Sequence, residues 1–234
     1  MRWCAIFILL CFVAFSVTAD TEKTVTLYPT DDTKIDEFFA SNNYGGSKSL
    51  EVRNGQGLFG GGWEIDSLLK FDLSSIPKNA TIISAELKLY YYKWKDNNPA
   101  GRELNVYRIE SDWNEESVTW NNKPSYASTK TSSAIIPSEE GAWMSWDVKK
   151  DVEKILNDGT NYGWIIKDDN TWGSTDIPYA FFYSKENAEN RPHLIITYEA
   201  YEKEKEEKKG IPAWEISLIF VAIVIAAYTK HRKT

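Results

Sequence analysis

The sequence predicts one all-β domain, built as a sandwich or barrel of short antiparallel strands, with an apolar segment at each end of the chain. Two observations support this. Short runs of alternating apolar residues recur between Thr24 and Tyr198, and clusters of turn-forming residues separate them. The two cysteines of the chain, Cys4 and Cys11, precede this region, so no disulfide can hold it and it must bury a core of its own.

Residues 1–19 are predicted to form a secretory signal peptide. Arg2 gives a short basic start, an apolar run covers residues 3–17, and residues 17–19 (Val-Thr-Ala) are the small residues that a signal peptidase recognises. Cleavage is therefore expected after Ala19, which would leave a mature protein without any thiol. An uncleaved membrane anchor is the alternative, although the run is short for the roughly 20 residues that a spanning helix needs.

The clearest strand is Ser84–Tyr91, in which every second residue from Ala85 onward is apolar. Because side chains alternate between the two faces of a strand, we expect one face of this segment to be buried. The other strands are expected at Thr24–Tyr28, Ser49–Arg53, Leu69–Leu73, Glu103–Glu110, Trp143–Asp147, Tyr162–Lys167, Ala180–Ser184 and Leu194–Tyr198.

One segment has a helical period instead. Apolar residues recur at Val148, Val152 and Ile155–Leu156, a spacing that places them on one side of a helix. Asp147 is predicted as the N-cap, and Gly159 lies just beyond the predicted end. We therefore expect one short amphipathic helix, packed on an end of the sandwich.

The C-terminal residues are predicted to anchor the domain, residues 20–200, in a membrane. Residues 201–210 form a charged linker, residues 211–229 an apolar transmembrane helix, and residues 230–234 a basic tail. The positive-inside rule keeps the basic tail in the cytoplasm and the domain outside, at the cell surface. The fully apolar part is shorter than the roughly 20 residues needed to cross a bilayer. This keeps a second interpretation open, in which residues 210–215 resemble the sorting motifs that sortase-like transpeptidases process in archaea and bacteria.

The charge balance argues against nucleic acid as a partner. The chain carries a formal net charge of −7 at pH 7, and four of its basic residues lie in the end segments: Arg2, Lys230, Arg232 and Lys233. The predicted domain is therefore more acidic still, whereas binding to a phosphate backbone needs a basic patch. We expect no nucleic-acid partner.

An ordered series of motifs carries a family resemblance. The run Leu68–Pro77 (LLKFDLSSIP) is followed by Ala80-Thr81-Ile82 and by Ser84–Tyr90 (SAELKLY). One further motif, Asn43-Tyr44-Gly45, precedes this run. The others follow it in the order Val106-Tyr107-Arg108, Trp113-Asn114-Glu115, Val118-Thr119-Trp120-Asn121, Tyr162-Gly163-Trp164, Phe182–Glu186 and Pro192–Tyr198. Over roughly residues 24–199 the chain resembles the DNRLRE domain, which is also classed as carbohydrate-binding module family 96 and is related to the repeats of archaeal disaggregatases. The resemblance implies a jelly-roll-like antiparallel β-sandwich that binds polysaccharide, with alginate-like uronic acids in studied members.

The candidate sugar-binding residues are aromatic side chains in polar, loop-like surroundings, namely Trp63, Trp94 and Trp172. Sugar rings present apolar C–H faces that stack on aromatic planes. An aromatic lid on the edge of the core is the other interpretation for each, and Trp113 and Trp120 are expected to line the core. Cations that would pair with an acidic sugar are Lys93, Lys95, Arg102, Lys167 and Lys185. The net negative charge keeps a neutral glycan open.

No cofactor is expected apart from calcium. Asp31 and Asp32, or Asp168 and Asp169, offer the hard oxygen ligands that calcium prefers, without EF-hand spacing. Asn79 begins an N-glycosylation sequon in a turn-like stretch.

The sequence does not predict an enzyme. The expected domain contains one histidine, His193, and neither a cysteine nucleophile nor zinc-ligand spacing. A polysaccharide hydrolase or lyase related to disaggregatase would need opposed carboxylates, for which Glu115 and Glu186 are the first candidates. The leading hypothesis is a non-catalytic polysaccharide-binding module at the cell surface. A structural envelope or adhesion protein that uses the same aromatic residues for protein contacts is the alternative.

Overall fold

The computed structural model describes residues 21–57 and 60–200, together with scattered residues between 218 and 232. Asp20–Tyr201 forms one compact unit, and the segments Met1–Ala19 and Glu202–Thr234 are grouped in another. The predicted signal peptide and charged linker lie outside the described residues, as does most of the predicted transmembrane helix and basic tail. Among the residues that are described, no helix is long and apolar enough to cross a membrane.

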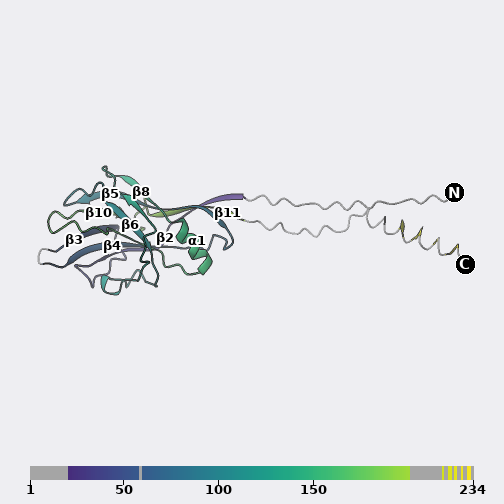
Figure 1. Ribbon diagram of the computed structural model, residues 1–234, viewed down its shortest axis with the longest axis horizontal. Coiled ribbons are helices and arrows are strands. Elements are labelled where there is room, and N and C mark those ends of the chain that lie inside the picture. The colour runs from purple at the N-terminus through teal and green to yellow at the C-terminus, as the bar shows by residue number, and fades with distance from the viewer. Residues whose placement is uncertain are drawn as a thin grey trace. The chain divides into compact units, whose positions relative to one another are not determined.

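The regular secondary structure in the described part of Asp20–Tyr201 is mostly antiparallel β-strand, which confirms the predicted all-β class (Figure 1). The elements in chain order are β1 (Thr21–Leu27), β2 (Pro29–Asp36), β3 (Ser49–Gln56), β4 (Gly62–Phe71), β5 (Thr81–Lys95), β6 (Glu103–Arg108), the 3₁₀ turn η1 (Trp120–Asn122), β7 (Ser132–Ile135), β8 (Ala142–Asp147), α1 (Lys149–Asp158), β9 (Trp164–Lys167), β10 (Tyr179–Tyr183) and β11 (His193–Ala200).

The strands form one continuous sheet that divides into two halves. The first half contains β1, β11, β5, β10 and β8, and the second contains β2, β4, β9, β6 and β7. Strand β3 joins the halves because its beginning pairs with β10 and its end, from Arg53 to Gln56, pairs with β4. Side chains from both halves enter the same main hydrophobic core, so the halves face each other as the layers of a sandwich do.

Strand β5 organises the first half. It pairs with β11 and then with β10 along one edge, and with β8 along the other. Ala85, Leu87 and Leu89 are buried, whereas Glu86 between them is exposed. The alternation predicted for this strand is therefore confirmed, and it gives the first half an inward face and an outward face.

Two strands were not anticipated by the sequence, β2 and β7. Strand β2 (PTDDTKID) contains few apolar residues, and yet Asp32, Thr33 and Asp36 are buried in it. Its backbone pairs with β4 over most of its length, which supplies the hydrogen bonds that hold a polar strand in place. Because most of the buried residues are polar and Ile35 is the one large apolar side chain among them, no apolar alternation identifies the strand.

Helix α1 lies at one end of the domain, and one detail of its prediction is wrong (Figure 1). Val148, and not Asp147, occupies the N-cap position. The Asp147 carboxylate still accepts a hydrogen bond of 2.9 Å from the backbone N–H of Lys149, so it satisfies an amide that the helix leaves free. Gly159 ends the helix with a φ of 74°, as a glycine beyond the last turn commonly does.

Several residues of the family motifs have structural roles. Trp113 is buried and donates from its indole nitrogen to the carbonyl oxygen of Tyr162, and Trp120 packs against the same small core. Gly163 has a φ of 79°, and a Cβ at this position would lie 1.9 Å from the carbonyl oxygen of Leu69. Only glycine permits this close approach between β9 and β4.

Candidate functional site

A continuous series of aromatic rings, which we call the aromatic ladder, follows the outward face of the first half-sheet and ends at Trp63 in β4 and Phe38 after β2. Neighbouring rings in the series have centroids 4.4–6.4 Å apart. Its members, in spatial order, are Tyr28, His193, Trp143, Tyr90, Tyr183, Tyr92, Phe181, Tyr179, Trp63 and Phe38. Most of them come from β5, β8 and β10, which lie together along the upper side of the domain in Figure 1.

The alternation of the strands explains why these rings share one face. In β10, Ala180 and Phe182 enter the main core, so Tyr179, Phe181 and Tyr183 point the other way. There Tyr179 and Phe181 are buried in a small cluster with Ile65. In β5 the pairing with β10 slips at one point, because Phe182 pairs with Tyr91 but Phe181 pairs with Lys93. The extra residue of this bulge is Tyr92, and both it and Lys93 contact the ring of Phe181 on the outward face.

The middle of the ladder is a stack of three tyrosines. Tyr183 lies between Tyr90 and Tyr92, at centroid distances of 5.7 and 4.4 Å, and the ring planes are within 7° of parallel. The Tyr92 hydroxyl lies 2.6 Å from the hydroxyl of Ser49, which fixes that end of the stack. At the other end Trp143 meets Tyr90 edge-on and is 39% exposed. The ladder therefore combines three half-buried tyrosines, stacked face to face, with an exposed indole.

A buried arginine lies near the opposite end of the ladder. The Cζ atom of Arg53 is 3.7 Å from the ring centroid of Trp63 and 4.1 Å from that of Tyr179. Arg53 is only 5% exposed, and its Nε has no hydrogen-bond partner in the described part of the chain. Burial lowers the pKa of its guanidinium, although the group stays charged at neutral pH. The two rings thus hold a cation in a fixed orientation.

A cleft of about 330 Å³ opens beside this arginine. Its lining includes Arg53 and Trp63, together with Asp96 and Asp176. Such a combination of an aromatic plane, a cation and carboxylates is suited to orienting a polar ligand with an apolar face.

Two lysines lie over the same rings. The Nζ of Lys93 is 4.7 Å from the centroid of Phe181, and the Nζ of Lys95 is 5.5 Å from that of Tyr179. Both side chains are exposed, so they can move aside or pair with an anion that settles on the ladder. Three cations, counting Arg53, therefore accompany the Trp63 end of the ladder.

The structure brings Trp63, Lys93 and Lys95 together and leaves the other predicted sugar-binding residues elsewhere. Trp94 pairs across strands with Ala180, whose side chain is in the core, so it lies on the opposite face of the sheet although it is 37% exposed. Its backbone N–H donates to Glu140.

The remaining predicted residues form other local groups. Arg102 has its guanidinium 4.7 Å from the ring of Trp172 and forms an ion pair with Asp168. Lys167 is buried and pairs with Glu64. Lys185 pairs with two glutamates, described below. None of these residues belongs to the ladder.

The predicted calcium ligands also separate. Asp168 accepts from Arg102, and the Asp169 carboxylate accepts from Asn105 and Tyr107, so donors already occupy these carboxylates. Asp31 accepts from Thr30. Asp32, its neighbour in β2, is buried on the other side of the strand and belongs to a different cluster.

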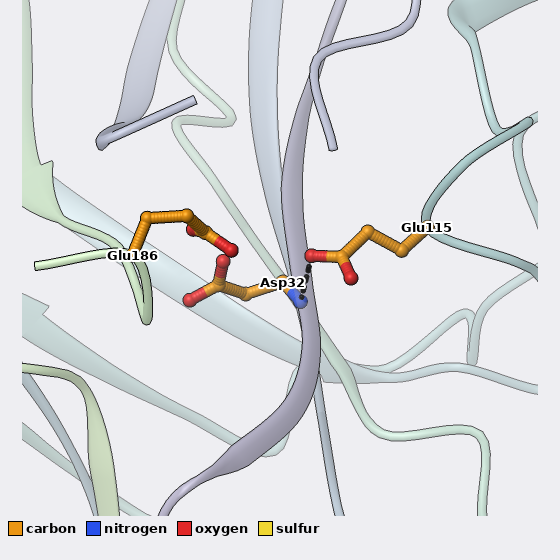
Figure 2. Close-up of side chains that lie close together, drawn as sticks. All are labelled: Asp32, Glu115 and Glu186. Carbon is orange, nitrogen blue, oxygen red and sulfur yellow. Dashed lines mark hydrogen bonds between the residues drawn. The ribbon is translucent and has the colours of Figure 1, made fainter. Parts of the chain in front are cut away.

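Asp32, Glu115 and Glu186 form this cluster, which we call the carboxylate cluster. One oxygen of each lies within 4.8 Å of the others, and Figure 2 shows the two glutamates pointing toward Asp32 from opposite sides. The backbone N–H of Asp32 donates to Glu115 over 3.1 Å. Burial raises the pKa of Asp32 to about 8, with smaller increases from the charges of Glu186 and Glu115. Asp32 is 1% exposed, and thus the cluster reaches below the surface.

Lys185 neutralises part of this charge. Its Nζ lies 3.1 Å from Glu115 Oε2 and 2.6 Å from Glu186 Oε1, and its backbone N–H donates to Asp32. The two glutamates that the sequence offered as a carboxylate pair are therefore close together, with an ammonium between them.

His193 and Asn79 complete the predicted positions. His193 lies on the outward face, next to Trp143 in the ladder. The structure places Asn79 at an exposed turn before β5. Its glycosylation stays a prediction.

The sequence interpretation missed most of the ladder because it looked for tryptophans in loops. Eight of the ten ladder residues are tyrosine, phenylalanine or histidine in or near strands. The available signal was the second half of the alternation, since Tyr90 in β5 and Tyr179, Phe181 and Tyr183 in β10 all alternate with core residues.

One comparison with known proteins gives a match. The family model of carbohydrate-binding module family 96 matches residues 23–198, a range that includes every residue of the ladder. No curated protein matches the chain.

Proposed function

Because this chain belongs to carbohydrate-binding module family 96, we propose that its aromatic ladder binds a polysaccharide chain without cleaving it. The observation that carries the proposal is the unbroken series of ring contacts from Tyr28 to Phe38 across the outward face. Stacking on sugar C–H faces needs aromatic rings that are exposed and fixed in orientation. The exposed rings of the ladder are Tyr28, Trp143 and Phe38, and half-buried rings lie between them. Contacts spread along the ladder in this way suit an extended polymer better than a single sugar.

The cations of the ladder favour a polysaccharide that bears carboxylates. Lys93, Lys95 and Arg53 lie over or between ladder rings, where they can pair with uronic-acid groups of a chain stacked on those rings. Asp96 and Asp176 line the same cleft as Arg53, and their carboxylates would repel a ligand with a high density of negative charge. The arrangement therefore fits a chain whose carboxylates are spaced along it, with the aspartates accepting from sugar hydroxyls.

The carboxylates of the chain support binding rather than hydrolysis. A glycosidase places two carboxyl groups on either side of a sugar, roughly 5–9.5 Å apart. In the carboxylate cluster Asp32 is buried, and Lys185 bridges Glu115 and Glu186. No sugar can enter between these groups without displacing the lysine.

We further propose that the domain is displayed at the cell surface, secreted by residues 1–19 and anchored by residues 211–229. The sequence features that support this are the apolar run before residues 17–19 and the apolar segment followed by a basic tail. Structural or adhesive packing through the same rings is the competing role.

Binding assays on the purified full chain test the proposal. Immobilised polyuronates and neutral polysaccharides should be compared at low and at high salt, with reducing-end release measured in parallel. We expect retention of a polyuronate without release of reducing ends. Absent binding to every glycan, together with concentration-dependent self-association, would favour the adhesive role, and new reducing ends would favour a hydrolase.

A further inference from the structure

The geometry points to a calcium-binding site at the carboxylate cluster of Asp32, Glu115 and Glu186. The three side chains come from β2, from the segment between β6 and η1, and from the segment after β10. Residues far apart in the sequence thus meet at one point. Asp32 and Glu115, for example, are 83 positions apart in the chain. This inference does not depend on the polysaccharide proposal, because it concerns a different group of residues.

Oxygen atoms without partners are the second observation that indicates a ligand. Asp32 is 1% exposed, and its Oδ1 has no hydrogen-bond partner within the described ranges. Oε2 of Glu186 is likewise buried and unpartnered. Figure 2 shows the Asp32 carboxylate directed toward that of Glu186. A buried carboxylate oxygen without a donor is costly to keep, and a cation between the two side chains would satisfy both.

The charge of the cluster also favours a divalent cation. Three carboxylates face one ammonium, that of Lys185, which reaches only Glu115 and Glu186 through its Nζ. The side chain of Lys185 is 23% exposed, so its ammonium can turn outward when an ion enters. We infer that lysine and calcium compete for the same two glutamates, and that calcium, unlike the lysine, also reaches Asp32.

The ligand type and spacing fit calcium. Calcium takes oxygen ligands at about 2.3–2.6 Å in flexible geometry, so two ligands across one ion lie roughly 4.6–5.2 Å apart. One oxygen from each residue of the cluster lies within 4.8 Å of the others, and the second oxygens allow bidentate binding.

The surroundings hold Glu115 in place for this role. The side-chain amide of Asn43 donates to the Glu115 carbonyl oxygen over 2.7 Å. Gly45 packs against the same residue, since a Cβ there would lie 2.6 Å from that oxygen. Both belong to the motif Asn43-Tyr44-Gly45, which therefore positions a ligand.

A thermal and calorimetric titration tests the site. The full chain, stripped with a chelator and kept in mild detergent, is titrated with calcium chloride and, separately, magnesium chloride. At a hundred-fold excess over Kd, we expect calcium to raise Tm by about 5–10 °C, because the ion binds only the folded state. Equal stabilisation by magnesium would overturn the calcium assignment.

Matched variants locate the effect. Glu186→Gln and Glu115→Gln should each weaken calcium binding more than about tenfold, since affinity follows the charge of the ligands. Glu189→Gln changes an exposed glutamate three residues from Glu186 and should leave binding unchanged. Lys185→Met removes the competing ammonium and should tighten binding.

Three results would overturn the inference. One is the absence of a calcium effect in both the unsubstituted chain and Lys185→Met. Another is unchanged calcium affinity in Glu186→Gln, and the third is an equal loss in Glu189→Gln. Each variant's circular dichroism and its Tm without calcium separate loss of binding from loss of folding.

Discussion

The two faces of the first half-sheet use the same strands for different purposes. The inward face carries side chains such as Leu87, Leu89 and Phe182, which are fully buried in the main core. The outward face carries Tyr90, Trp143 and other rings of the aromatic ladder, of which Trp143 is exposed and Tyr90 is half-buried. Because one residue separates the two sets, the difference teaches that a strand's alternation can encode stability on one side and recognition on the other.

The largest effect that tests this comparison is expected on the inward face. Leu87→Ala removes a fully buried side chain and should lower the free energy of unfolding by about 2–5 kcal/mol. Its neighbour Glu86 points outward and is exposed, so Glu86→Ala should change that free energy by less than about 0.5 kcal/mol. Urea unfolding followed by tryptophan fluorescence measures both. Similar costs for the two variants would contradict the assignment of the faces.

The second prediction compares two tryptophans of similar exposure on opposite faces. Trp143 is 39% exposed and Trp94 is 37% exposed. Trp143→Ala should raise the Kd for the bound polysaccharide about 3- to 10-fold, as expected for the loss of one aromatic contact. Trp94→Ala should leave that Kd unchanged, because its side chain lies on the other face. Affinity electrophoresis gives both values, and a larger loss for Trp94→Ala would place the binding face elsewhere.

The third prediction concerns the cations over the ladder. The double substitution Lys93→Gln and Lys95→Gln should weaken binding of an acidic polysaccharide several-fold at low ionic strength. The loss should vanish near 1 M salt, where the Debye length is about 3 Å. Lys150→Gln, an exposed change on α1, is the matched control. Equal weakening toward neutral glycans would show that the lysines act through packing and not through charge.

The smallest expected effect is a pH dependence from His193. Burial lowers the pKa of this imidazole below its ordinary 6.5, the charge of Lys88 lowers it further, and the hydrogen bond to the Arg191 carbonyl opposes the shift. Below pH 6.5 the unfolded chain takes up the proton first, so the free energy of unfolding should fall with pH until the folded imidazole is itself protonated. Above pH 6.5 the group contributes no pH dependence.

His193→Gln should remove this component of the acid-side decline, which urea unfolding at several pH values between 4.5 and 7.5 would reveal. If the variant and the unsubstituted chain have the same pH profile, His193 is not the source of this pH dependence.

The sequence predicted the fold well wherever burial follows apolar alternation. The nine expected strands all exist, and β5 and β11 alternate as predicted. The prediction failed where the buried residues are polar, as in β2, because Asp32 and Asp36 give no apolar signal. The pairing of β2 with β4, which holds them in place, joins residues that are distant in the sequence and leaves no mark in a local pattern. Jelly-roll connectivity stays a prediction.

The candidate sites were predicted only in part. Trp63, Lys93 and Lys95 were identified because they combine suitable chemistry with a polar context, whereas Trp94 has the same context and the opposite orientation. Adjacent strand residues point to opposite faces, so context could not separate Trp94 from its two lysine neighbours. The carboxylate cluster depends on contacts between residues up to about 150 positions apart, which local spacing does not reveal.

Strand β11 has a mechanical consequence. It lies between β1 and β5, pairing with β1 from Leu194 to Ala200 and with β5 from His193 to Glu199. Tension entering the domain through the chain after Ala200 would therefore pull along a strand that is bonded on both edges. Such a load strains many backbone hydrogen bonds at once, in shear, instead of opening them one after another. The pairing of β11 on both edges thus suits this end of the domain to withstand tension.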